Sequence, residues 1–101
     1  MLLVFTDEDT VGWKLSKEEG LTKFMTIENQ YILAEITSNH GFIGIRNDGQ
    51  IERVSCLTGK IEEGCECEVE LPTHLRLMGK GQVLVASCLS HTAHIVSLKK
   101  Q

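Results

Sequence analysis

The residues from Cys65 to Leu71 alternate between apolar and acidic side chains without interruption. Cysteines, a valine and a leucine occupy the odd positions, and Glu66, Glu68 and Glu70 occupy the even positions between them. Successive side chains of a β-strand point to opposite faces, whereas those of a helix repeat about every 3.6 residues. The pattern therefore predicts an extended segment with one buried face and one acidic face in contact with water.

Period-two patterns recur along the chain and predict a series of short strands. The expected strands are 21–27, 31–37, 42–46, 50–55, 65–71, 74–78, 82–88 and 93–98. Helix signals are weak, because the capping-box sequence at Ser16 is followed almost at once by Gly20. We therefore expect a mainly β fold, an antiparallel β-sandwich or small barrel of seven to eight strands with little helix, as a single domain over residues 1–101.

The sequence Asn47-Asp48-Gly49 between two predicted strands is the clearest hairpin signal. Glycine accepts the positive φ that a tight turn requires, and Asn or Asp tolerates it at a neighbouring position. A three-residue loop would pair Ile45 with Ile51, and a two-residue loop would instead pair Ile43 with Val54. Both registers place apolar residues on both sides of the hairpin. This predicts a sheet covered on both faces, or one with a face buried against another subunit.

Five carboxylates fall within nine positions, at Glu62, Glu63, Glu66, Glu68 and Glu70. An edge strand carries such charge to discourage pairing with other sheets, which would explain the cluster without any partner. The alternative is a binding surface. Glutamates at every second position of a strand lie about 6.6 to 7 Å apart, close to the spacing of successive phosphates, so the strand would fit a basic groove.

Charge is distributed unevenly along the chain. Residues 61–71 contain five acids and no base, and residues 72–101 contain four bases and no acid. If the two segments lie side by side in the fold, their opposite charges would cancel. Alternatively, the acidic segment of one copy would bind the basic segment of the next, so that copies of the chain join head to tail. The net charge of −4 argues against direct nucleic-acid binding, which needs a basic face.

Cysteines and histidines offer only a weak metal site. Cys65 and Cys67 would share one strand face, and His91 and His94 are the candidate imidazole ligands for zinc. The spacing matches no zinc-finger pattern, and cysteines are common in protein cores, so we expect structural thiols, no metal and no cofactor. Cys88 continues a nearly unbroken apolar run and is interpreted as a core thiol. With no nucleophile–base arrangement evident, we do not expect an enzyme.

No segment approaches the roughly 18 consecutive apolar residues of a membrane span. The apolar residues Met1–Phe5 are followed at once by polar residues, so this segment is too short for a secretory signal. Four cysteines without such a signal predict reduced thiols in a cytoplasmic protein.

The stretch Gly81–Ile95, GQVLVASCLSHTAHI, resembles the strand pair of the tryptophan-dependent RNA-binding attenuation protein family, and Lys60–Gly64 resembles a lysine-bearing turn of that family. That family forms rings of small β-sandwiches that bind tryptophan between subunits and wrap single-stranded RNA. The resemblance implies a ring-forming β-sandwich that binds a small ligand or single-stranded RNA. The two matches imply different alignments and the family's basic RNA-binding stripe is missing, so no residue role is carried over.

These observations favour a non-catalytic binding or inhibitory module. Its acidic strand would meet a basic protein partner, with mimicry of nucleic acid and assembly into a homo-oligomer as further expectations. The ring-forming β-sandwich and a zinc-stabilised β domain are the alternatives.

Overall fold

The computed structural model describes residues 2–5, 9–38 and 41–100. This part of the chain contains eleven β-strands and no helix. In chain order they are β1 (Leu2–Phe5), β2 (Thr10–Ser16), β3 (Gly20–Ile27), β4 (Tyr31–Ser38), β5 (Gly41–Arg46), β6 (Gln50–Ser55), β7 (Ile61–Glu66), β8 (His74–Gly79), β9 (Gln82–Ser87), β10 (Thr92–Ser97) and β11 (Lys99–Lys100). The mainly β fold is confirmed. The number of strands exceeds the expected seven to eight, because β1, β2 and β11 were not predicted.

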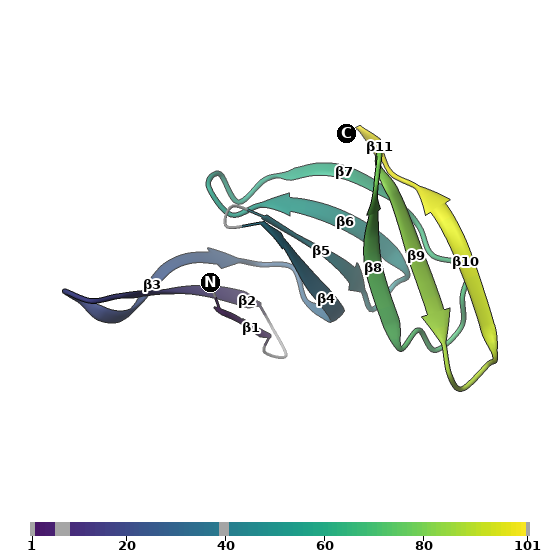
Figure 1. Ribbon diagram of the computed structural model, residues 1–101, viewed down its shortest axis with the longest axis horizontal. Helices are drawn as coiled ribbons and strands as arrows, with labels where there is room; N and C mark the ends of the chain where they lie inside the picture. Colours follow the sequence, from purple (N-terminus) through teal and green to yellow (C-terminus); the bar gives the residue numbers. More distant parts are fainter. Residues whose placement is uncertain (1, 6–8, 39–40, 101) are drawn as a thin grey trace.

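The strands form three antiparallel sheets. Their strand orders are β1-β2-β3, β11-β7-β6-β5-β4 and β10-β9-β8, and over the described residues none of them closes into a barrel. Figure 1 shows the purple and blue N-terminal sheet at one end of the molecule and the green and yellow C-terminal sheet at the other. The five-stranded sheet lies between them, in a molecule measuring 45 × 26 × 22 Å.

The hairpin of β5 and β6 has the register of a three-residue loop. Ile45 lies opposite Ile51, which selects one of the two pairings that the sequence allows. Gly49 has a φ of +89°, and its amide donates a 3.0 Å hydrogen bond to the carbonyl of Arg46. The positive φ explains why glycine is needed at this turn position.

The five-stranded sheet has an apolar cluster on each face. Alternation along β5 sends Ile43 to one face and Phe42 to the other, and both side chains are fully buried. The face of Ile43 packs against the C-terminal sheet in a cluster formed by Ile43, Ile45, Ile51, Val69, Leu75, Val83, Val85 and Leu98. The opposite face carries a cluster formed by Ile27, Tyr31, Phe42, Val54 and Cys56. Apolar burial on both faces agrees with the sequence pattern.

The end of the chain connects the C-terminal sheet to the five-stranded sheet. Leu98 is buried between β10 and β11, and its amide donates a 2.7 Å hydrogen bond to the carbonyl of Gly81. Strand β11 then pairs with β7, with Lys99 opposite Gly64 and Lys100 opposite Glu63. The basic end of the chain therefore runs directly beside the acidic strand, which is the side-by-side arrangement of the two charged segments.

The acidic strand is shorter than the alternation predicts. The expected strand covered residues 65–71, whereas β7 ends at Glu66. Glu66 pairs with Gln50, the first residue of β6, so no strand residue of β6 is left to pair with the next residues. Leu71, which was expected to point inward, is 65% exposed and has a φ of +50°. The prediction of an extended strand to Leu71 is therefore wrong from Cys67 onward, over the last five of its seven residues.

Within the described residues, no helix is long and apolar enough to cross a membrane.

Candidate functional site

Four of the five predicted glutamates are exposed. Glu62 and Glu66 lie on β7, and Glu68 and Glu70 follow in the segment that leaves the sheet. Between Glu66 and Glu70 the burial still alternates, because Cys67 is half-buried and residue 69 is buried, although the strand pairing has ended. Over residues 66–70 the alternation thus predicted correctly which side chains meet solvent, whereas Leu71 is exposed against the prediction.

These four carboxylates, Glu62, Glu66, Glu68 and Glu70, form what we call the acidic surface. None of the four is within ion-pair distance of a cationic group among the residues that the structure describes. The register places Lys99 opposite Gly64, and Glu62 and Glu66 lie two residues before and after that glycine along β7. The basic neighbour therefore lies near part of the acidic surface without forming an ion pair with it.

Glu63 belongs to the opposite face of β7. It pairs across the sheet with Arg53 of β6, and Arg53 Nη1 lies 3.2 Å from Glu63 Oε1. The two side chains are 36% and 22% exposed, so this contact is a partly solvated ion pair. Of the five predicted glutamates, Glu63 is the one whose charge is balanced inside the fold.

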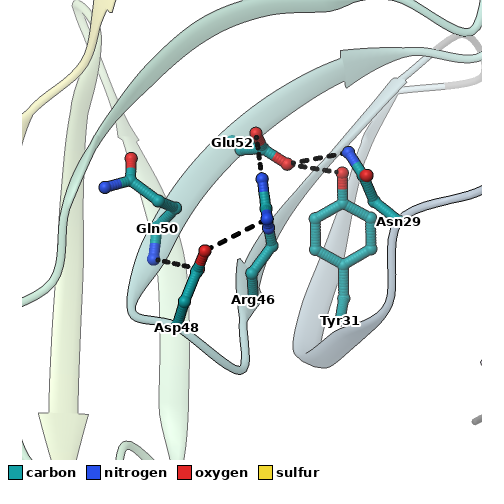
Figure 2. A network of polar contacts seen from close by, with 6 residues as sticks. All are labelled: Asn29, Tyr31, Arg46, Asp48, Gln50 and Glu52. Carbon is teal, nitrogen blue, oxygen red and sulfur yellow. Dashed lines mark hydrogen bonds and ion pairs between the residues drawn. The ribbon is translucent and has the colours of Figure 1, made fainter.

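A second group of polar side chains lies at one end of the five-stranded sheet and was not identified from the sequence. Figure 2 shows Glu52 at its centre. Tyr31 donates its phenol hydrogen to Glu52 Oε1 at 2.9 Å, and Asn29 Nδ2 donates to the same oxygen at 3.3 Å. Arg46 Nη1 lies 3.5 Å from Glu52 Oε2, and Arg46 Nη2 lies 3.0 Å from Asp48 Oδ2. A carboxylate that is only 7% exposed is thus surrounded by donors.

Burial keeps the phenol of Tyr31 protonated. It raises the pKa of the Tyr31 phenol above its ordinary value, with a smaller contribution from the neighbouring Glu52 carboxylate. Tyr31 therefore stays protonated and can donate to Glu52. Because Glu52 already receives two hydrogen bonds and an ion pair, its carboxylate organises the fold locally rather than offering a free base.

A shallow hollow lies beside this polar group. It has a volume of about 410 Å³ and is lined by polar side chains of two loops, namely Glu28, Asn29, Gln30, Arg46, Asn47 and Asp48. Its lining has no apolar floor of the kind that holds most small organic ligands. The hollow alone therefore does not identify a ligand class.

The four candidate zinc ligands lie on three parts of the fold, namely β7 with the segment after it, the turn after β9, and β10. Cys65 and Cys67 are half-buried against the core between the two sheets, as expected for structural thiols. His91 lies in the turn after β9 with a φ of +56°, and His94 is exposed on β10. Among the described residues, no three His, Cys, Asp or Glu side chains gather closely enough to hold a metal ion.

Cys88 is not the core thiol that its apolar neighbours suggested. Strand β9 ends at Ser87, and Cys88 begins the following turn, where it is exposed. Its Sγ lies 3.9 Å from Nδ1 of His74, at the start of β8. The fold brings Cys88 to a histidine 14 residues earlier in the chain. Nothing in the local sequence signals that contact, because it depends on the pairing of β8 with β9.

Compared with protein-family models, with curated proteins and with solved structures, the chain has no match in any of the three.

Proposed function

We propose that this protein is a non-catalytic binding module whose acidic surface binds a basic surface of another protein. The observation that carries the proposal is the exposure of Glu62, Glu66, Glu68 and Glu70 without an ion-pair partner among the described residues. Exposed carboxylates of one sign lose little solvation when they approach a complementary charge at an interface rim, and they attract it over several ångströms.

Such a surface acts mainly on the rate and specificity of association. Each exposed ion pair contributes only about 0 to 1 kcal/mol, so the four carboxylates work as a group that steers the partner and fixes its orientation. Binding through the acidic surface should therefore weaken steeply as salt is added.

The partner that we propose is a protein that normally binds nucleic acid. The module would occupy the nucleic-acid-binding groove of that protein and so inhibit it. Support comes from the regular exposure of Glu66, Glu68 and Glu70, with the intervening side chains turned inward. Three exposed carboxylates within five residues present to a basic groove negative charge of the kind that a phosphate backbone presents to it.

Two finer features accompany this proposal. The five-stranded and C-terminal sheets share one apolar cluster, which supports a sandwich of these two sheets as the rigid base of the acidic surface. All four cysteines are free thiols, which supports a reducing, cytoplasmic location.

The test is capture from a cell extract by the tagged protein, followed by purification and titration of the basic protein that is retained. The test variant is Glu68→Gln/Glu70→Gln, which removes two charges from the acidic surface and leaves the β7 ladder intact. We expect the affinity to fall about 5- to 30-fold, since removing two cooperating rim contacts costs about 1 to 2 kcal/mol. A single-stranded oligonucleotide should compete with the module for the partner.

The matched control is Glu18→Gln/Glu19→Gln, which removes the same charge from the turn between β2 and β3, where both side chains are exposed. This control should bind as the unmodified protein does. Equal affinity of the two double variants would contradict the proposal, because net charge rather than the acidic surface would then govern binding. Retention of the partner in the presence of excess oligonucleotide would contradict the proposed class of partner.

A further inference from the structure

Cys88 differs from the other three cysteines in its surroundings. Cys56 is buried, and burial raises the pKa of its thiol. Cys65 and Cys67 are half-buried beside the core, and Cys67 Sγ donates to the carbonyl of Val69 at 3.5 Å. Cys88 is exposed, so of the four thiols it is the one that solution reagents reach most readily.

The imidazole of His74 lies next to this exposed thiol. Its Nδ1 is 3.9 Å from Cys88 Sγ and 2.9 Å from Thr73 Oγ1. The backbone holds the two residues in place, because the Cys88 amide donates to Thr73 Oγ1 at 3.0 Å and the Thr73 amide donates to the carbonyl of Ala86 at 2.9 Å. The contact is therefore built by the pairing of two chain segments, and it is not a chance approach of two flexible side chains.

We propose that Cys88 and His74 form a thiol–imidazole pair that reacts with low-molecular-weight disulfides and makes Cys88 a site of reversible S-thiolation. As the sulfur attacks one sulfur of the disulfide, the thiol proton passes to Nδ1 of His74. A new bond forms between Cys88 Sγ and the attacked sulfur, and the original S–S bond breaks. The departing thiolate takes the proton from the imidazolium, so the products are a mixed disulfide and one free thiol.

Thr73 positions the pair. Its hydroxyl lies 3.4 Å from the carbonyl of Ala86 as well as 2.9 Å from His74 Nδ1. At 2.9 Å one hydrogen lies between Thr73 Oγ1 and His74 Nδ1. When the hydroxyl turns its hydrogen to the Ala86 carbonyl instead, it releases Nδ1, whose lone pair then takes the thiol proton. The same oxygen accepts the Cys88 amide hydrogen, which keeps Sγ on the side of the imidazole.

The reaction is tested on the full chain with oxidised glutathione at neutral pH, following the mixed disulfide by intact mass and locating it by peptide mass spectrometry. N-acetylcysteine under the same conditions provides the rate of an unassisted thiol. We expect Cys88 to react at least about tenfold faster than this reference, a smaller gain than the roughly hundredfold or more that proton transfer to a well-positioned base typically supplies. Cys88→Ser should abolish the adduct, and Cys67→Ser should leave its rate unchanged.

The role of His74 is tested with His74→Asn, which keeps a polar group near the position of Nδ1 and removes the base. We expect the rate of Cys88 to fall to that of N-acetylcysteine, while the far-ultraviolet circular dichroism and thermal midpoint stay close to those of the unmodified protein. Imidazole added to His74→Ala should accelerate the reaction more than it accelerates that of the unmodified protein.

Three results would overturn the proposal. They are a rate for Cys88 no higher than that of N-acetylcysteine, an unchanged rate in His74→Asn, and an adduct located on another cysteine. Rescue of His74→Ala by imidazole separates proton transfer from mere positioning, because a structural role would not respond to a free base.

Discussion

Tyr31 on β4 reaches across β5 and donates a 2.9 Å hydrogen bond to Glu52 on β6. The residue of β5 that lies opposite Glu52 is Gly44, and the Tyr31 ring covers the space that a side chain would occupy there. The missing side chain thus opens the path by which a phenol reaches a buried carboxylate two strands away. The edge of the same ring also packs against Phe42, with the ring centroids 5.3 Å apart and the planes at 85°.

Replacing Tyr31 with Phe tests this hydrogen bond. The variant keeps the ring packing and leaves Glu52 with Asn29 and Arg46 as partners, so we expect the free energy of unfolding to fall by about 1.5 to 3 kcal/mol, the range for hydrogen bonds to charged groups. Urea unfolding followed by circular dichroism measures the change, and an unchanged slope with denaturant would show that the unfolded state is not altered. Loss of less than about 0.5 kcal/mol would show that the phenol contributes little.

Gly44→Ala tests the close approach of the ring. A Cβ atom at this position would lie 2.6 Å from Cδ1 of Tyr31, so the ring or the strand must shift. We expect the free energy of unfolding to fall by about 1 to 3 kcal/mol, as for other overpacked sites. Urea unfolding measures this change.

A double-mutant cycle provides the control for that prediction. In a Tyr31→Ala background the ring is absent, so Gly44→Ala should cost much less than in the unmodified protein. If the cost is equal in both backgrounds, the steric conflict with Tyr31 is not the cause of the destabilisation.

Stability should decrease at alkaline pH because of Tyr31. Burial raises the pKa of its phenol above the ordinary value of 10.0, so the unfolded chain ionises at lower pH than the folded protein does. The contribution is fully present below about pH 10 and is lost as pH rises from there toward the folded pKa. Burial also raises the pKa of the Cys56 and Cys65 thiols. These thiols therefore lower the stability at alkaline pH too, and they do so equally in the unmodified protein and in Tyr31 variants.

The measurement compares the free energy of unfolding of the unmodified protein and Tyr31→Phe between about pH 9 and about pH 11. The difference in the free energy of unfolding between the unmodified protein and Tyr31→Phe should shrink as pH rises. Tyr31 is the single tyrosine of the chain, so its phenolate absorbance reports its titration directly. A midpoint at or below the ordinary tyrosine value would contradict the prediction.

The two faces of β7 should differ in partner binding. Glu62 is exposed on the acidic surface, whereas Glu63 lies on the other face with Arg53 at 3.2 Å. We therefore expect Glu62→Gln to weaken binding of the captured partner more than Glu63→Gln does. Titration of the purified partner with each variant gives the comparison. A larger loss of affinity in Glu63→Gln would contradict the prediction, because the partner would then bind the face of β7 that carries Glu63.

The hairpin and most strand positions were predictable because they depend on local chemistry. Gly49 supplies the positive φ of the turn. Alternation in 50–55 and the bounded apolar run over 82–88 predict strands from sequence alone, and β6 and β9 lie there. The exposure of Glu66, Glu68 and Glu70 followed from the same alternation. The choice between two hairpin registers needed the structure, because both place apolar residues on both faces.

The end of β7 and the place of Cys88 were not predictable in this way. Strand β7 stops at Glu66 because its partner β6 begins at Gln50, and no local pattern in 65–71 contains that information. In the sequence Cys88 continues an apolar run. In the structure it lies one residue beyond Ser87, the last residue of β9 that pairs with a neighbouring strand. In both cases a neighbouring strand decides where pairing ends.

The sequence by itself determined that this chain is built from short antiparallel strands and that Glu66, Glu68 and Glu70 face solvent, because the flip of successive residues is a property of the extended backbone. Only the tertiary structure decided what meets across strands: Tyr31 with Glu52 over Gly44, Arg53 with Glu63, and Cys88 with His74. These contacts depend on strand order and register, which arise from packing residues that lie far apart in the chain.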